Sequence, residues 1–360
     1  MTISLTIASF FILIVTLLPL WRNPHWLVRG LDFPRLQFAT LAVLVLLLQL
    51  FFTDSSNTLV SLTMLSNLLC FIWQAWWIAP YTPFWSREVK SCKPDSQEQR
   101  ISIMTANVLT PNRNAQALLD HVAALQPDIL VTLESDQWWE SQLDSLSEQM
   151  PYNVKCPLDN LYGMHLYSRL PLLETEIAYL VEEDVPSIHG LVELADGNKI
   201  RLHCLHPSPP SPTENPESGE RDAELMLIAR SIADCEYPVI VTGDLNDVAW
   251  SATTRLFRKI SKLLDPRVGR GMFNTYHADY PIIRWPLDHL FHSAHFCLAN
   301  IQRLAPIGSD HFALFATFSF NETPVQSQSG LDAEAEDKQW ARDITRQQNV
   351  KKKDAPQPGQ

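Results

Sequence analysis

The chain has 360 residues and a formal net charge of −12, and it is long enough for one large domain or two ordinary ones. Residues 86–320 alone carry 31 acidic against 19 basic side chains, which is the wrong sign for sequence-independent binding to a nucleic-acid backbone. The six cysteines lack the spacing of a zinc site, so we expect reduced packing residues and a reducing compartment.

Three long apolar segments without a charged side chain lie in the first 85 residues: Ile3–Leu20, Leu36–Phe52 and Leu59–Ile78. Each is long enough to cross the hydrocarbon core of a bilayer, about 30 Å thick, as a helix. A cleaved signal peptide is the alternative for the first segment, but no Lys or Arg precedes it and no small-residue cleavage site follows. Residues 1–85 are therefore predicted to be a three-helix transmembrane anchor with the lipid bilayer as partner. Three polar residues within the later spans are expected to hydrogen-bond between helices: Gln49, Asn67 and Gln74.

Basic residues gather in the loop between the first two spans and directly after the third span: Arg22, Arg29, Arg35, Arg87, Lys90 and Lys93. By the positive-inside rule, the first loop and the large C-terminal part lie on the cytoplasmic side of a bacterial inner membrane. This difference in positive charge between the loops depends on few residues, so a C-terminal part outside the cytoplasm is the alternative.

Beyond the anchor, the chain divides into a polar linker (86–100), an α/β domain (101–320) and a polar tail (321–360) that is expected to be disordered. Apolar β-like runs predict strands at 101–105, 129–133, 164–168, 188–194, 200–205, 239–242, 287–291 and 312–318. Helical patterns follow Asn114 and cover 220–232 and 253–264, which indicates a layered α/β domain. The proline-rich loop 207–219 is predicted to form a wall that faces the substrate.

Polar side chains occur in, at the end of, or beside these apolar runs: Asn107, Glu134, His206, Asp244, Asn246, Asp288, Asp310 and His311. Each alone could be a turn residue, a surface acid, a core histidine or an ion-pair partner. Together they predict one site, because carboxylates and carboxamides suit a hard cation such as Mg²⁺, with Mn²⁺ as an alternative. Two histidines, one with an aspartate behind it, can transfer protons.

The motifs TANV, PDILVTLE, LHCLHPSPP, TGDLND, PLDHLF and GSDH occur in this order over roughly residues 100–320. This ordered set resembles the endonuclease/exonuclease/phosphatase superfamily, the deoxyribonuclease I-like fold. The resemblance implies a four-layer α/β sandwich of two mixed sheets flanked by helices. The three-span anchor resembles a bacterial membrane-attached branch of that family.

The resemblance also implies roles for the eight residues. Glu134 would be the main Mg²⁺ ligand, helped by Asn107 and Asp310. Asp244 would orient or deprotonate the attacking water, and Asn246 would hold a phosphate oxygen. His311, oriented by Asp288, would contact the scissile phosphate. His206 would stabilise the transition state or protonate the leaving group.

The leading functional hypothesis is a membrane-anchored, Mg²⁺-dependent phosphoesterase that acts on a lipid-linked or small phosphate ester. The acidic domain, the long loop after His206 and the tryptophans Trp138, Trp139 and Trp285 favour it over a membrane-anchored nuclease. A catalytically inactive scaffold is a third hypothesis, which the intact set of eight residues disfavours. Arg221, Arg267 and Arg270 are candidate phosphate contacts, with solvated surface residues as the alternative. No protein partner can be inferred.

Overall fold

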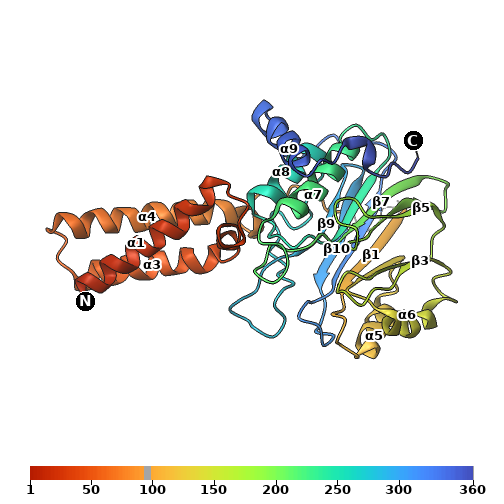
Figure 1. Ribbon diagram of the computed structural model, residues 1–360, viewed down its shortest axis with the longest axis horizontal. Helices are drawn as coiled ribbons and strands as arrows, with labels where there is room; N and C mark the ends of the chain where they lie inside the picture. The colour runs from red at the N-terminus through yellow and green to blue at the C-terminus, as the bar shows by residue number, and fades with distance from the viewer. Residues whose placement is uncertain (93–98, 360) are drawn as a thin grey trace.

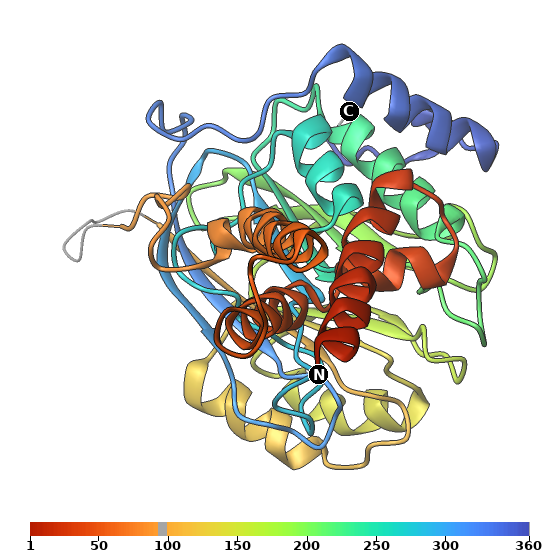
Figure 2. The ribbon, with the colours of Figure 1, turned by 90° about the vertical axis from the view of Figure 1, so that its left-hand side faces the viewer.

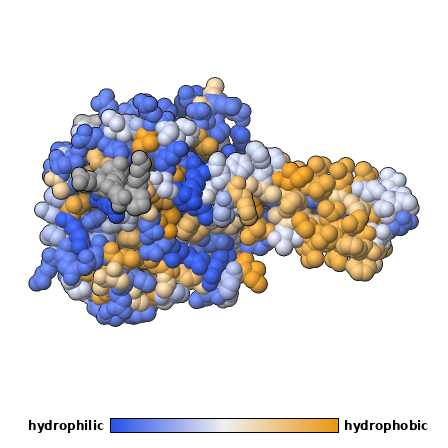
Figure 3. All heavy atoms as spheres, turned by 180° about the vertical axis from the view of Figure 1, so that it is seen from behind, coloured by the Kyte–Doolittle hydropathy of each residue, from blue (hydrophilic) through white to orange (hydrophobic). Residues whose placement is uncertain are grey.

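The computed structural model describes residues 1–92 and 99–359. Its three long N-terminal helices are α1 (Thr2–Leu17), α3 (Arg35–Phe52) and α4 (Thr58–Ile78), and all three are long and apolar enough to cross a membrane. They form a bundle that projects from one side of a compact α/β part (Figure 1). The bundle presents a continuous apolar surface, whereas the visible face of the α/β part is mainly hydrophilic (Figure 3). This contrast is what a membrane anchor beside a water-exposed domain requires.

Polar side chains meet inside the bundle, as the sequence predicts. Asn67 Nδ2 donates to Ser9 Oγ at 2.8 Å and to Gln49 Oε1 at 2.9 Å. Gln74 Nε2 donates to Thr16 Oγ1 at 3.1 Å. The bonds of Asn67 join α4 to both α1 and α3, and the bond of Gln74 joins α4 to α1 at a second level. They satisfy polar groups that would otherwise be costly in hydrocarbon.

The α/β domain, residues 99–359, contains two mixed sheets, as predicted. The first has the order β10-β11-β1-β2-β4-β3, and its strands are β1 (Arg100–Asn107), β2 (Ile129–Leu133), β3 (Tyr152–Cys156), β4 (Met164–Ser168), β10 (Phe296–Arg303) and β11 (Leu314–Phe320). The second has the order β5-β6-β7-β8-β9, and its strands are β5 (Leu172–Ala178), β6 (Ser187–Glu193), β7 (Lys199–Leu205), β8 (Val239–Asp244) and β9 (Asp288–His292). Only β1–β2 and β7–β8 pair in parallel among these strands.

Helices cover the outer face of each sheet, and the main apolar core lies between the sheets. Two helices pack on the first sheet, α5 (Ala115–Leu125) and α6 (Gln137–Leu143). Two others cover the second sheet, α7 (Gly219–Ile232) and α8 (Ala252–Ser261), and α9 (Ala335–Gln347) packs on these two helices. Seen from the end of the bundle, these two groups of helices lie on opposite sides of the domain (Figure 2). The four-layer sandwich is thereby confirmed.

The tail is not disordered as the sequence analysis expected, because residues 335–347 form α9. A capping box between Glu334 and Asp337 starts the helix, and Ala341 and Ile344 are buried against α7 and α8. Lys259 of α8 donates to Asp337 at 2.8 Å. The apolar stripe of α9 is narrow within a polar sequence, so composition alone conceals it.

The predicted linker also packs on the domain where it is described. Val89 is fully buried, and Glu88 forms an ion pair with the buried Arg258. Residues 93–98 of that linker lie outside the described residues.

The bundle is joined to the α/β domain by more than its chain connection. Trp250 Nε1 donates to the carbonyl oxygen of Asp32 at 2.8 Å, and Tyr81 Oη donates to that of Ala249 at 2.6 Å. A buried apolar cluster spans the junction: Ile78, Tyr81, Val248, Ala249, Trp250, Val268 and Leu287. The anchor and the domain therefore form one packed unit at this junction.

Replacement of Tyr81 by Phe tests this junction. Tyr81→Phe leaves the carbonyl of Ala249 without its donor, and we expect it to lower the free energy of unfolding by roughly 1–3 kcal/mol. Thermal unfolding of the full-length protein in detergent micelles measures this change. Tyr152→Phe, at an exposed tyrosine, is the matched control and should leave the unfolding temperature unchanged. Equal unfolding temperatures for both variants would contradict the role of Tyr81.

Candidate active site

Strand ends from both sheets bring three of the predicted residues together. Asn107 ends β1, Glu134 follows β2, and Asp244 ends β8. The Asn107 Nδ2 group donates to Glu134 Oε1 at 2.7 Å and to Asp244 Oδ2 at 3.3 Å. Because β1 and β2 are parallel neighbours, their carboxyl ends lie at the same edge of the first sheet. Strand β8 reaches the same place from the second sheet.

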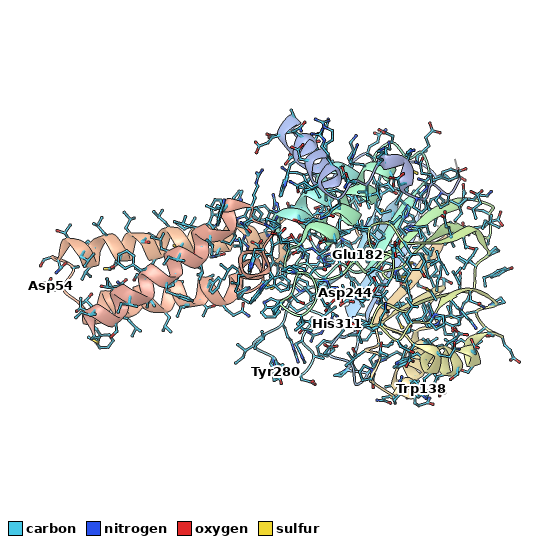
Figure 4. The ribbon with its side chains drawn as sticks, viewed as in Figure 1. Asp54, Trp138, Glu182, Asp244, Tyr280 and His311 are labelled. Carbon is cyan, nitrogen blue, oxygen red and sulfur yellow. The ribbon has the colours of Figure 1, made fainter. Side chains whose placement is uncertain are left out.

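His311 lies between two aspartates. Its Nδ1 atom is 2.8 Å from Asp288 Oδ2, and its Nε2 atom is 3.4 Å from Asp244 Oδ2. Burial alone would lower the pKa of His311, but the charges of Asp288 and Asp244 outweigh it and raise that pKa to about 10. The ring is therefore an imidazolium at neutral pH. Figure 4 shows Asp244 and His311 side by side in the half of the domain nearer the bundle.

Glu134 has the features of a cation ligand. The Oε2 atom is buried and has no hydrogen-bond partner among the described residues. Burial raises the pKa of the Glu134 carboxyl group to about 7, against the donated hydrogen bond from Asn107. A bound cation would offset this loss of solvation. Asp310 lines the same cavity as Glu134 and adds a second carboxylate. Oxygen donors of this kind fit a hard divalent ion such as Mg²⁺.

A second group of possible ligands overlaps this one. The ligand atoms of Asp244, Asp288 and His311 all lie within 4.8 Å of one another. However, the hydrogen bond between His311 and Asp288 already uses one ligand atom of each residue. Mg²⁺ also prefers oxygen to imidazole nitrogen, so Glu134, Asn107 and Asp310 suit it better.

Asn246 and His206 lie next to this cluster. Asp244 Oδ1 accepts a hydrogen bond from the Asn246 N–H group at 2.9 Å, and Asn246 Nδ2 donates to the carbonyl oxygen of Pro207 at 3.0 Å. His206 is buried with its ring 5.4 Å from that of Tyr162. Burial lowers the pKa of His206 to about 4, so its ring is neutral at neutral pH. Asn246 lines the cavity. His206 is not among the described residues that line it, but the charges of Asp244 and His311 act on the pKa of its ring.

The cavity at this cluster has a volume of about 610 Å³. Glu134, Asp244, Asn246, Asp310 and His311 line one part of it. The loop after His206 contributes Pro209, Pro210, Ser211 and Glu214, as predicted for a wall that faces the substrate. The remaining wall includes Tyr276, Trp285 and Leu287 of the α/β domain and four residues of the loop between the first two spans: Trp26, Gly30, Phe33 and Pro34.

Two parts of this wall were not predicted from the sequence. Tyr276 packs on His311 with ring centroids 4.9 Å apart, and no local pattern marks it. The contribution of residues 26–34 was missed because only tertiary packing brings that loop to a site whose residues begin 73 positions later in the chain, at Asn107. Trp285 does line the cavity, but Trp139 is a core residue, and Figure 4 shows Trp138 on the side of the domain away from the bundle.

The three arginines suggested as phosphate contacts bind other parts of the protein instead. The alternative, a solvated surface residue, was also wrong for Arg221 and Arg267, which are fully buried. Arg221 binds Asp222 at 2.8 Å and donates to the carbonyl oxygen of Asn246 at 2.7 Å. Arg267 is held by Asp265 and donates to the carbonyl oxygen of Asp288 at 3.1 Å. Arg270 donates to the carbonyl oxygens of Pro266 and Val89. These guanidinium groups hold backbone segments in place, two of them at Asn246 and Asp288.

Comparisons with known proteins agree with this architecture. Residues 104–311, more than half of the chain, match the model of the Endonuclease/Exonuclease/phosphatase family. No curated protein matches the chain.

Solved structures share the fold at low sequence identity. D. rerio TDP2 complexed with a single-strand DNA product has a TM-score of 0.52 and 19% identity, over 61% of this chain and 99% of that chain. The human Nocturnin catalytic domain with bound sulfate has a TM-score of 0.52 and 19% identity, over 65% and 98% of the two chains. An endonuclease/exonuclease/phosphatase from Beutenbergia cavernae has a TM-score of 0.50 and 13% identity, over 62% and 72%. This chain belongs to the endonuclease/exonuclease/phosphatase family, whose members are metal-dependent enzymes that hydrolyse phosphoester bonds.

Proposed function

We propose that this protein is a membrane-anchored, Mg²⁺-dependent phosphoesterase that hydrolyses a lipid-linked or small-molecule phosphate ester. One observation carries the proposal. The cavity that holds Glu134, Asp244 and His311 is closed on another side by the loop between the first two apolar helices. An anchor that only tethered the enzyme would have no reason to contribute a wall of the active site. The reaction centre would therefore lie beside the membrane surface.

One group of side chains would bind the cation, and Asp244 would activate the attacking water. Glu134, with Asn107 and Asp310, would hold Mg²⁺, which when bound polarises a phosphoryl oxygen and offsets developing negative charge. Asp244 would orient the attacking water and accept its proton, since its Oδ2 atom lies at the cluster while Oδ1 is held by the Asn246 N–H group.

The remaining residues would hold the phosphoryl group. The His311 imidazolium would donate a hydrogen bond to a phosphate oxygen, with Asp288 fixing the orientation of the ring. The amide of Asn246 would contact a second phosphate oxygen. His206, whose neutral ring can donate one hydrogen bond, would stabilise the leaving group in the transition state.

We also propose that the α/β domain faces the cytoplasm of a bacterial cell, because the arginines of the first loop and the basic residues after the third span favour that side. Protease treatment of inverted membrane vesicles tests this orientation. A domain that resists digestion until detergent is added would be assigned to the other side of the membrane.

A nuclease is the second candidate function, because the TDP2 structure of similar fold contains a single-strand DNA product. The charge of the residues that line the cavity argues against a nuclease. None of the described residues that line the cavity is a lysine or an arginine, and two of them, Glu134 and Glu214, are glutamates. Tight DNA binding that weakens steeply with rising salt would favour the nuclease over the lipid-linked or small ester.

Removal of the Glu134 charge tests the metal site. We expect full-length Glu134→Gln, assayed in detergent with bis(p-nitrophenyl) phosphate, to lose activity by about 10³-fold because the main cation ligand is neutralised. Chelation of Mg²⁺ should reduce the native enzyme to a similar level. Glu148→Gln changes an exposed glutamate and serves as the matched control. Equal rates for native enzyme and Glu134→Gln would refute the enzymatic proposal.

Asp288 is a positioning residue, and its replacement by Asn has a specific kinetic signature. Asp288→Asn preserves the shape of the side chain but removes the charge that orients His311. We expect kcat to fall by about 10²-fold while KM changes little, because Asp288 contacts His311 rather than the substrate. Steady-state kinetics with the same ester measure both constants. Asp120→Asn, on the exposed face of α5, is the control, and a rise in KM at constant kcat would contradict the assigned role.

A further inference from the structure

A short hairpin on the α/β domain, Tyr276–Trp285, connects the active-site cavity with the base of the helical bundle. Its two ends, Tyr276 and Trp285, form a β-bridge and both line the cavity. Tyr276 packs on the catalytic His311, and the Trp285 ring lies 5.6 Å from that of Phe33 in the loop between the first two spans. The base of the hairpin is therefore part of the active site.

The tip of the hairpin is a rigid apolar turn. Pro281 follows Tyr280, and the Ile283 N–H group donates to the Tyr280 carbonyl oxygen at 3.1 Å, which closes a β-turn. Below the tip, Arg284 donates to the carbonyl oxygens of His277 at 3.1 Å and Ala278 at 2.6 Å. The turn is thus held in shape by its own hydrogen bonds.

The apolar side chains of this turn are more exposed to solvent than is usual for apolar residues. Tyr280 is 58% exposed, Ile282 81% and Ile283 46%. Among the described residues of the α/β domain, these two isoleucines are the only exposed ones of their kind, and they are adjacent in the chain. Exposed apolar side chains that cluster in this way mark a surface that contacts another apolar phase.

The position of the turn identifies that phase. Gln37 Nε2, in the first turn of the apolar helix α3, donates to the carbonyl oxygen of Ile282 at 2.7 Å. Figure 4 shows Tyr280 on the side of the domain that faces the bundle. The tip therefore lies at the level where α3 enters the hydrocarbon, which is the boundary between headgroups and acyl chains.

We propose that the Tyr276–Trp285 hairpin inserts its tip into the bilayer and that its base, with Phe33, guides the apolar chain of a lipid phosphoester from the membrane to His311. This inference rests on the proposed function and commits it to a substrate that resides in the bilayer. The phosphate would reach the polar part of the cavity, while the apolar chain would lie along Phe33, Trp285 and the turn. A soluble phosphate ester would not need this path.

Photo-crosslinking tests the position of the hairpin without requiring turnover. The full-length protein is reconstituted into vesicles of phosphatidylcholine that carry a diazirine on an acyl chain. We expect lipid adducts on the peptide that contains residues 277–284, and none on the peptide that contains the exposed Tyr152. Absence of adducts on 277–284, or crosslinks there to a second copy of the chain, would overturn the proposal.

Kinetics in the same vesicles test the path of the substrate. Turnover is measured with phospholipids and lipid pyrophosphates in the bilayer, and separately with soluble bis(p-nitrophenyl) phosphate. For Ile282→Glu/Ile283→Glu, we expect the ratio of lipid to soluble turnover to fall about tenfold, since two charges oppose insertion. Ile282→Leu keeps the turn apolar and should keep the native ratio of lipid to soluble turnover. Tyr152→Glu should also leave that ratio unchanged.

The two proposals fail in different ways in these experiments. The lipid path alone would be overturned if soluble turnover needs Mg²⁺ and Glu134 but the enzyme turns over no lipid. It would also be overturned if the double variant keeps the native ratio of lipid to soluble turnover. If the native enzyme shows no Mg²⁺-dependent turnover of any ester, the proposed function is overturned. The crosslinks would still report whether the hairpin enters the bilayer.

Discussion

The packing of strand β1 against strand β8, across the interface between the two sheets, sets the geometry of the active site. The hydroxyl groups of Thr105 and Thr242 lie 2.6 Å apart and join the two strands near their carboxyl ends. Two residues further along each strand are Asn107 and Asp244. The two sheets therefore meet at the point where a carboxamide and a carboxylate leave their strands, and Glu134 and His311 contact this pair from either side.

A chain of buried charges extends from this site toward the helical bundle. Arg221 holds the carbonyl oxygen of Asn246 and the carboxylate of Asp222, and Asp222 is 3.6 Å from Arg29 in the loop between the first two spans. Each buried charge has a partner of opposite sign, because an unpaired one would be strongly destabilising. The loop between α1 and α3 is thus coupled to the loop that carries Asn246 through packed ion pairs, in addition to forming a wall of the cavity.

The differences between sequence expectation and structure have a common physical origin. Arg221 and Arg267 looked like phosphate contacts because the sequence does not show which groups a guanidinium will contact. Their partners are backbone carbonyls and aspartates that burial brings within hydrogen-bond distance. Helix α9 was hidden for the same reason, since its few apolar residues matter only once α7 and α8 are present to cover them.

The sequence by itself determined the three apolar helices, the two-sheet α/β fold and the polar residues at the strand ends, because each depends on local periodicity or on an ordered set of motifs. It did not determine that the loop between α1 and α3 forms a wall of the cavity at Glu134 and Asp244, that Tyr276 packs on His311, or that the turn at Ile282 meets the base of α3. Tyr276 and His311 are 35 residues apart in the chain, and Gln37 and Ile282 are 245 residues apart. Only the packing of the whole chain decides such contacts, because no local preference encodes which distant surfaces meet.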